Sequence, residues 1–124
     1  MSGPSAYPRP LTARERATLV AMVEHGRPDD DAAVAPQRRA RWRQRADAGL
    51  VYGRCGCGQC PSIDLGDLDG PARGTGSRVV LAAEHGTTIV LLFVDDDRPS
   101  YLELFEVGES GRHDQFPDPG GLVF

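Results

Sequence analysis

The sequence predicts an α+β fold in which two N-terminal helices pack on one face of an antiparallel meander sheet of four or five strands. Three observations support this class. Helix-forming segments with capping signals occupy the first 49 residues, and β-branched or alternating segments follow from Leu50 onwards. The connections between these segments are rich in Gly, Pro and Asp, and the length of 124 residues suits one domain with its own core.

The N-terminal part is expected to contain a leader and a first helix. Residues 1–10 hold three prolines without a periodic pattern, which predicts a disordered leader before a single domain over 11–124. Thr12 and Glu15 have the spacing of a capping box, so the helix is expected to begin after Thr12, and Gly26 is expected to end it in a left-handed conformation. The apolar stripe of this helix consists of Leu11, Ala17, Leu19, Val20 and Val23.

The second helix is expected over residues 37–48, with Pro36 in its first turn and Gly49 after its end. The three aspartates at 29–31 precede it and are expected to complement the positive amino end of the helix. Trp42 is its only large apolar side chain. One narrow face is therefore expected to be buried, while the rest of the helix faces solvent.

Five strands are expected in the second part of the chain. A loop rich in glycine over 66–77 divides them, and a turn at 95–99 joins the last two. The continuous apolar run over 89–94 is typical of a central strand that is covered on both faces. Most of the core is expected to come from this run together with Leu102, Leu104, Leu19, Val20 and Val23. The expected strands cover residues 50–53, 62–65, 78–83, 87–94 and 100–107.

Charge is distributed unevenly along the chain, whose formal net charge is −4. Residues 1–50 carry nine Arg against six acidic residues, a balance of +3, whereas residues 51–124 carry five Arg against twelve, a balance of −7. The acidic part favours a basic partner or a cation, and it makes nucleic acid an unfavoured ligand because phosphates would be repelled. No segment has the roughly 18 successive apolar residues of a membrane span, and the first residues lack the apolar core of a signal peptide, so a cytoplasmic protein is expected.

All three cysteines, Cys55, Cys57 and Cys60, lie within six residues. The glycines between them allow tight turns, so the sulfur atoms could converge, and the last two have the spacing of a zinc knuckle. A structural zinc ion needs four ligands. The candidates for the fourth are Asp64, His85 and His113.

The same cysteines permit other interpretations. Cys55 and Cys57 could face the core of a hairpin as small apolar side chains. A thioredoxin-like redox pair would need a helix to start at the motif, whereas Pro61 and a strand pattern follow Cys60. A nucleophilic cysteine would need a neighbouring base, which the sequence does not place.

Two charged groups have less specific patterns. The aspartates at 64, 67 and 69 and at 95–97 could bind a hard cation, but Asp is also typical of turns and the spacing does not match an EF-hand, so the turn interpretation is preferred. The arginines at 38, 39, 41, 43 and 45 surround Trp42 and form a positive helix. A solvated helix face explains them better than a nucleic-acid surface.

Three motifs carry a resemblance: CGCGQCPS at residues 55–62, LFVDD at 92–96 and SYLE at 100–103. Together they resemble a group of short uncharacterised proteins, mainly actinobacterial, over roughly residues 11–119. The resemblance implies one cytoplasmic domain and carries over no catalytic residue.

These observations predict one of two functions. The first is a small acidic binding or regulatory protein for a basic protein partner, of the antitoxin-like or immunity-like kind. The alternative is a metal-binding protein that holds zinc through Cys55, Cys57 and Cys60. An enzyme is less favoured because no catalytic pattern is evident, and zinc is the only cofactor indicated.

Overall fold

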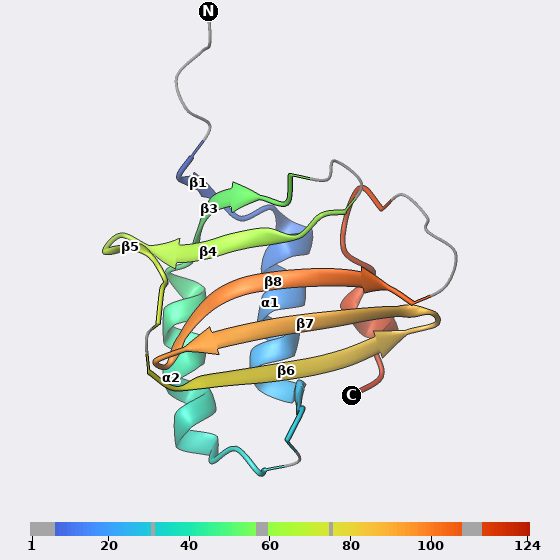
Figure 1. Cartoon of the computed structure of the whole chain (residues 1–124), viewed down its shortest axis with the longest axis horizontal. Coiled ribbons are helices and arrows are strands. Elements are labelled where there is room, and N and C mark those ends of the chain that lie inside the picture. The colour runs from blue at the N-terminus through green and yellow to red at the C-terminus, as the bar shows by residue number, and fades with distance from the viewer. Residues whose placement is uncertain (1–6, 31, 57–59, 75, 108–112) are drawn as a thin grey trace, which may run out of the picture.

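The computed structural model describes residues 7–30, 32–56, 60–74, 76–107 and 113–124. Within them, two helices lie side by side on one face of a twisted sheet whose strand pairs are antiparallel (Figure 1). The predicted α+β class is therefore confirmed. Neither helix in this part of the chain has the length and apolar character needed to cross a lipid bilayer.

Helix α1, Ala13–His25, begins with the predicted capping box. The Thr12 hydroxyl accepts a hydrogen bond from the Glu15 amide at 3.1 Å, and the Glu15 carboxylate accepts one from the Thr12 amide at 2.8 Å. Both bonds satisfy backbone donors that have no partner within the helix. Arg9 holds the same carboxylate in a two-pronged ion pair at 2.9 and 3.0 Å.

The end of α1 differs from the prediction, because Gly26 has φ −52° and is not left-handed. Glycine is required there for space instead: a Cβ atom would lie 2.5 Å from the carbonyl oxygen of Met22 and 2.7 Å from the Cβ of Leu81. Two residues of the predicted stripe are less covered than expected, since Val20 is half-buried and Ala17 is exposed. The buried residues of α1 are Glu15, Thr18, Leu19, Met22 and Val23.

Helix α2, Pro36–Asp47, has proline in its first turn as predicted. Its N-cap is Ala35, and no side chain makes a capping hydrogen bond there. The capping that the sequence predicts for the aspartates at 29–31 is therefore absent at the N-cap. Asp31, the last of the three, lies outside the described residues. Trp42 and Ala46 are the buried residues of the helix. This is the narrow buried face that the sequence predicts.

In the part of the chain that the structure describes, the sheet holds eight strands, more than the four or five predicted. The five predicted strands correspond to β3 (Leu50–Arg54), β4 (Ile63–Asp67), β6 (Arg78–His85), β7 (Thr88–Asp95) and β8 (Arg98–Glu106). The other three are β1 (Arg9–Pro10), β2 (Arg27–Pro28) and β5 (Gly70–Pro71). Each of these short strands ends in proline, which a sheet accepts at its edges because no ladder bond is lost there.

The order of the strands is β1-β3-β4-β8-β7-β6-β2, with β5 beside β4, so the sheet is not the predicted simple meander. Strands β6, β7 and β8 do form a meander, but β4 pairs with β8 rather than with β6. At the other end of the chain, Arg9 and Pro10 already pair with β3. The folded part therefore includes residues that the sequence assigns to a leader ending at residue 10.

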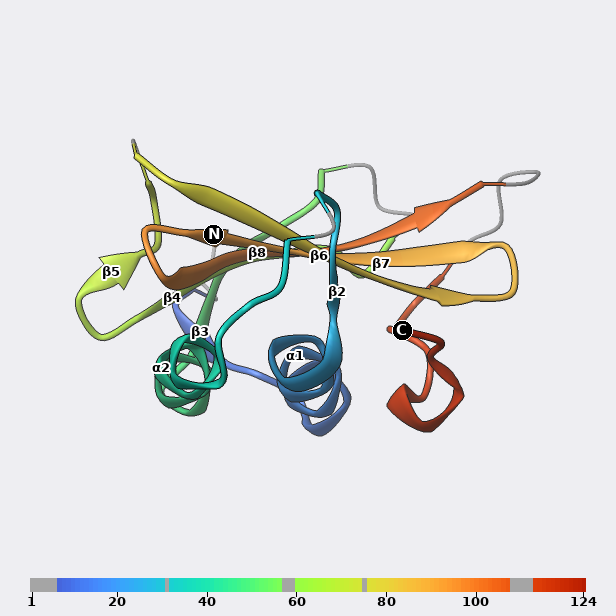
Figure 2. The same ribbon diagram turned by 90° about the horizontal axis from the view of Figure 1, so that it is seen from below.

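The core lies between the helices and the sheet (Figure 2). Ile89, Leu91 and Phe93 of β7 face the opposite side and are only half-buried. No helix or strand of the described residues covers that side, so the prediction that 89–94 is covered on both faces is wrong. The buried residues of β7 and β8 that face the helices are Val90, Leu92, Val94, Leu102 and Leu104.

Candidate functional site

The cysteine turn joins β3 to β4 at one end of the sheet. The Cys55 amide donates a hydrogen bond of 2.9 Å to the carbonyl of Ser62 and closes the turn. Cys55 and Cys60 are both half-buried. Cys57, the third predicted zinc ligand, lies outside the described residues, so the convergence of all three sulfur atoms stays a prediction.

Buried Ser62 connects the cysteine turn with β8. Its hydroxyl oxygen accepts a 2.9 Å bond from the Leu104 amide and a 3.3 Å bond from the thiol of Cys60. Burial raises the pKa of Tyr101 to about 12; a hydrogen bond with Ser62 opposes this rise, and nearby Cys55 and Cys60 add to it. The two described cysteines therefore share Tyr101 as a neighbour.

The residues predicted as a fourth zinc ligand lie in different places. Asp64 is exposed on β4. His113 lies 3.3 Å from the Glu106 carboxylate, and His85 lines the same cavity of about 350 Å³ as those two residues. Within the described ranges, no three Cys, His, Asp or Glu side chains are grouped closely enough to hold a metal ion, and that statement does not extend to Cys57.

Two of the predicted acidic residues hold distant segments together. Asp67 is buried and pairs with Arg98 at 3.0 Å and Arg45 at 3.3 Å. Burial alone would raise the pKa of Asp67, but hydrogen bonds and these guanidinium groups lower it on balance. Asp95 pairs with Arg78 at 2.7 Å, and this contact is the main reason that its pKa is also lowered.

The turn between β7 and β8 explains the positions of two further aspartates, Asp96 and Asp97. Asp96 and Asp97 have φ values of 50° and 63°, and positive φ at both central residues is the geometry of a type I′ hairpin turn. The Asp97 carboxylate accepts bonds from the Arg38 guanidinium at 2.7 Å and from the Trp42 indole at 2.9 Å. The turn interpretation is thereby confirmed for these residues, and the same turn attaches α2 to the sheet.

The basic residues of α2 are largely occupied within the protein. Arg43 pairs with Glu24 at 2.9 Å and Asp47 at 3.0 Å. Arg39 donates to the carbonyl oxygen of Val23 at 2.9 Å. These contacts are typical of a solvated helix face, and the bonds from Arg39 to carbonyl oxygens leave its charge in place.

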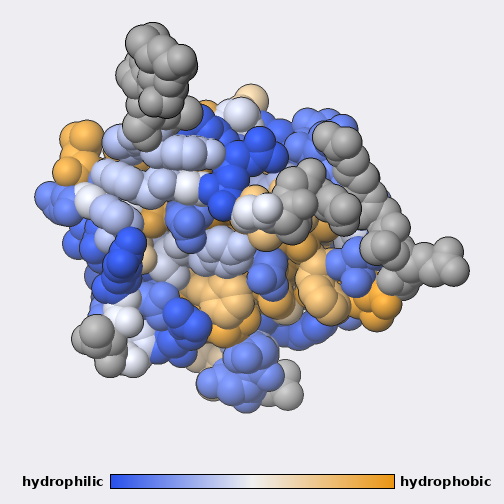
Figure 3. Space-filling model, turned by 45° about the horizontal axis from the view of Figure 1, so that its top comes forward, coloured by the Kyte–Doolittle hydropathy of each residue, from blue (hydrophilic) through white to orange (hydrophobic). Residues whose placement is uncertain are grey.

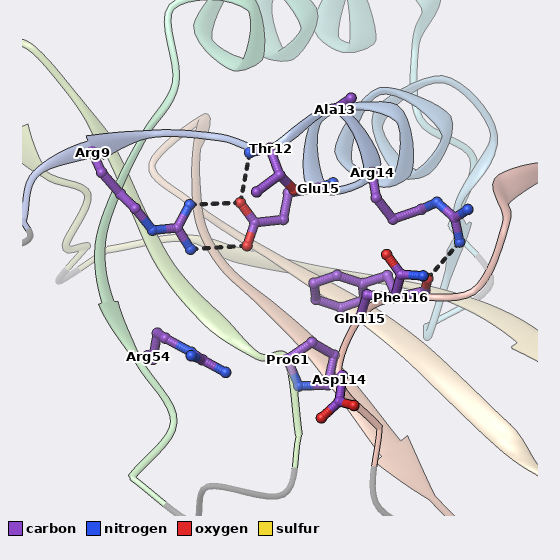
Figure 4. A pocket seen from close by; sticks show the side chains of 10 residues that line it. All are labelled: Arg9, Thr12, Ala13, Arg14, Glu15, Arg54, Pro61, Asp114, Gln115 and Phe116. Atoms are coloured by element: carbon purple, nitrogen blue, oxygen red, sulfur yellow. Dashed lines mark hydrogen bonds and ion pairs between the residues drawn. The ribbon is translucent and has the colours of Figure 1, made fainter.

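A cavity of about 560 Å³ lies between the start of α1, the two ends of the cysteine turn and the segment before the C-terminal tail (Figure 4). Of its three arginines, Arg9 is neutralised by Glu15, and Arg14 donates a 2.9 Å bond to the carbonyl of Phe116. Arg54 and Asp114 lie at its lower side in Figure 4. Three arginines and two carboxylates thus line this cavity, and the contacts of Arg9 and Arg14 hold neighbouring segments of the chain together.

The side of the sheet opposite the helices, called the open face below, has a different character. Figure 3 shows this side obliquely, with an apolar area over the middle of the sheet and hydrophilic residues around it. By strand alternation, the open face consists of Asp64, Arg78, Val80, Ala82, Glu84, Ile89, Leu91, Phe93, Asp95, Tyr101, Glu103 and Phe105.

The strand register places apolar side chains beside acidic ones on the open face. Leu91 lies opposite Glu103, and Ile89 lies between Phe105 and Glu84. Phe105 is 52% exposed. Each strand pair therefore contributes both contact area and negative charge to the same surface.

A cavity of about 390 Å³ lies on the open face beside the loop that precedes β6. Its wall includes Asp64 of β4, Tyr101 and Glu103 of β8, and Arg73 of the loop. No arginine of the described residues lies within ion-pair distance of Asp64 or Glu103. The Arg78 guanidinium, which also lines this cavity, is already paired.

The sequence does not single out the open face as a site. Alternation places Tyr101 and Glu103 on one face of a strand, but only the pairing of β4 with β8 brings Asp64 beside them. Asp64 is considered there as a metal ligand, and Tyr101 appears only within a motif.

No family model, curated protein or solved structure matches this chain.

Proposed function

We propose that the protein is an acidic binding or regulatory module whose open face receives a basic, partly apolar surface of a protein partner. One observation carries the proposal: the open face combines uncovered aliphatic and aromatic side chains with an excess of carboxylates. Counting the loop residue Arg73, four carboxylates stand against two guanidinium groups there. The acids are Asp64, Glu84, Asp95 and Glu103.

The apolar part of the open face provides a reason for association. Ile89, Leu91 and Phe93 are only half-covered within the chain, and Phe105 is 52% exposed. Covering apolar surface stabilises a complex by roughly 25 cal/mol per Å². Apolar patches with a polar border are typical of protein interaction sites.

The carboxylates provide the selectivity for a basic partner. Charges at the edge of an interface speed association with a surface of opposite sign and disfavour partners of like sign. An antitoxin-like or immunity-like role would use the same physics, since such proteins act by covering a partner. The proposal requires a partner with Arg or Lys side chains next to apolar ones.

A site-specific photo-crosslinker tests this surface in cells. We expect a crosslinker at Leu91 to capture a defined basic polypeptide, and one at Gln44, exposed on α2, to capture none. With the captured protein purified, Leu91→Lys is expected to weaken binding about tenfold or more, because it removes apolar contact and adds a like charge. Gln44→Lys is the matched control.

Two results of the comparison between Leu91 and Gln44 would contradict the proposal. One is equal capture at Leu91 and Gln44, which would indicate random collisions. The other is an equal affinity of the Leu91→Lys and Gln44→Lys proteins for the captured polypeptide, which would place its binding surface elsewhere. Capture of a second copy of this chain would also contradict a basic partner, because this chain is acidic.

Zinc binding is a second candidate, which the placement of the half-buried Cys55 and Cys60 on one closed turn favours. Elemental analysis of untagged protein is expected to find one zinc ion per chain, and Cys60→Ser is expected to lose it because a thiolate ligand is removed. His25→Ala, a change away from the turn, is expected to retain the metal. Zinc far below one equivalent in the unaltered chain would rule this function out.

A further inference from the structure

We infer that the cavity around Tyr101, Asp64 and Glu103 is a site for a single cationic side chain, an arginine or lysine that the partner inserts into the open face. The inference rests on the proposed function and narrows it to one contact. It identifies the ligand class as a guanidinium or ammonium group.

The cavity has a suitable size and a negative balance of charge: its wall holds three carboxylates, Asp64, Asp95 and Glu103, and two arginines, Arg73 and Arg78, of which Arg78 is paired with Asp95. Its volume is about 390 Å³, which exceeds that of one long side chain, and the Tyr101 ring forms part of its wall. Asp64 is the direct cross-strand neighbour of Tyr101. Directly opposed side chains on one face have Cβ atoms about 5 Å apart. A cation in contact with the ring would therefore also reach the Asp64 carboxylate.

Glu103 lies near the same ring, along β8. It lies two residues after Tyr101 on β8, so both side chains project from the same face, about 7 Å apart along the strand. The electrostatic effect of Glu103 on the Tyr101 hydroxyl agrees with this closeness. One aromatic ring with two carboxylates near it is a favourable environment for a cation.

The open face already contains a filled arrangement of the same kind. The Arg78 guanidinium lies 5.1 Å from the ring centre of Phe93 and pairs with the Asp95 carboxylate at 2.7 Å. Phe93 and Tyr101 are cross-strand partners with ring centres 6.0 Å apart. The Phe93 ring is thus already in contact with a cationic side chain of this chain, Arg78. Among the described residues, Tyr101 has no such arginine, although two carboxylates lie near it.

A small-molecule titration tests the site without the partner. The full-length chain is titrated with acetyl-arginine amide and followed by amide chemical shifts; acetyl-citrulline amide has the same shape without the charge. We expect saturable shifts around Tyr101 with the arginine probe and none with the citrulline probe. Acetyl-lysine amide with a free ε-amine shows whether an ammonium group is also accepted.

Variants assign the binding to the two carboxylates. Asp64→Asn and Glu103→Gln remove one charge each from exposed or half-exposed positions. Each is expected to lower the affinity for the arginine probe about three- to tenfold. Asp47→Asn on α2 removes the same charge away from the site and is expected to leave the affinity unchanged. Equal shifts with arginine and citrulline probes, or equal affinities in all three variants, would overturn the inference.

The result also separates this inference from the proposed function. Arginine binding without any partner at Leu91 would support the cation site and contradict the proposed function. A partner that binds the open face with unchanged affinity in both Asp64→Asn and Glu103→Gln would support the proposed function and contradict the cation site.

Discussion

Leu91 and Leu92 are neighbours in sequence but face opposite sides of the sheet. Leu92 is fully buried among the core side chains, whereas Leu91 is half-buried on the open face. We expect Leu92→Ala to lower the free energy of unfolding by about 2–5 kcal/mol, since it removes buried contacts and leaves a cavity. Leu91→Ala should cost less than about 1.5 kcal/mol, because water already reaches that side chain.

Urea denaturation of both variants measures this difference. Equal losses of stability would mean that a further layer covers the open face of the isolated chain. They would also weaken the proposed function, since Leu91 would then lack the exposure that a partner requires.

Gly66 on β4 shows how closely the backbone packs at the β4–β5 turn. A Cβ atom there would lie 2.3 Å from the carbonyl oxygen of Gly70 and 2.7 Å from the Cα of Pro71. Both contacts are with backbone, so Gly66→Ala must displace the turn and is expected to cost about 1–3 kcal/mol. Gly56 is the matched control, because a Cβ atom there would meet nothing within 4 Å.

Thermal unfolding compares these two alanine variants. A clear loss of melting temperature is expected for Gly66→Ala and almost none for Gly56→Ala. The same melting temperature for both would show that the β4–β5 turn can move away at little cost.

The turn between β7 and β8 links two elements that are distant in sequence. Asp97 in this turn accepts hydrogen bonds from Arg38 and from Trp42, and the Arg38 guanidinium also lies 5.2 Å from the indole centre. The hairpin is thereby tied to α2 through one carboxylate. Asn tolerates the left-handed conformation of this position as well as Asp does.

Asp97→Asn therefore removes the charge without straining the turn. We expect a loss of about 0.5–1 kcal/mol, because the ion pair is partly exposed to solvent. Trp42 is the only tryptophan, so its fluorescence reports on this contact directly. An unchanged emission spectrum together with unchanged stability would contradict the role given to Asp97.

At the scale of the whole molecule, the two halves of the sequence become two layers of opposite charge. Residues 1–50, with a balance of +3, supply both helices, whereas the acidic part beyond them supplies most of the sheet. The open face comes entirely from that acidic part. The negative character of the proposed interaction surface follows from this division, and the arginines of the helices lie on the other side of the molecule.

The dependence of stability on pH is also a property of the whole molecule. The pKa values of Asp95 and Asp97 are lowered mainly by Arg78 and Arg38, and those of Glu15 and Asp67 are lowered on balance although burial opposes it. A carboxylate with a lower pKa in the folded state stabilises it above the unfolded pKa. Acid removes this contribution.

We therefore expect the free energy of unfolding to fall as the pH drops below about 4 and then through the lower pKa values that these carboxylates have in the folded state. Denaturation curves recorded from about pH 7 downwards measure this loss. Asp97→Asn should show a shallower dependence, because one of the titrating groups is gone. A stability that does not change down to about pH 3 would mean that these ion pairs contribute nothing to folding.

Much of the local structure could be predicted because its causes lie within a few residues of each other. The capping box of Thr12 and Glu15, the proline at the start of α2 and the five long strands all depend on neighbours in sequence. The two-residue strands could not be predicted, since two residues have no periodicity to recognise. The number of strands differs from the prediction for that reason.

By itself, the sequence determined the α+β class, the helix starts, the alternation of the strands and the uneven charge, since each depends on composition or short-range spacing. Only the tertiary structure decided that β4 pairs with β8, that one side of β7 is left uncovered and that Asp64 lies beside Tyr101. Those features depend on contacts between distant segments. Such contacts are selected by the packing of the whole core, which no local pattern encodes.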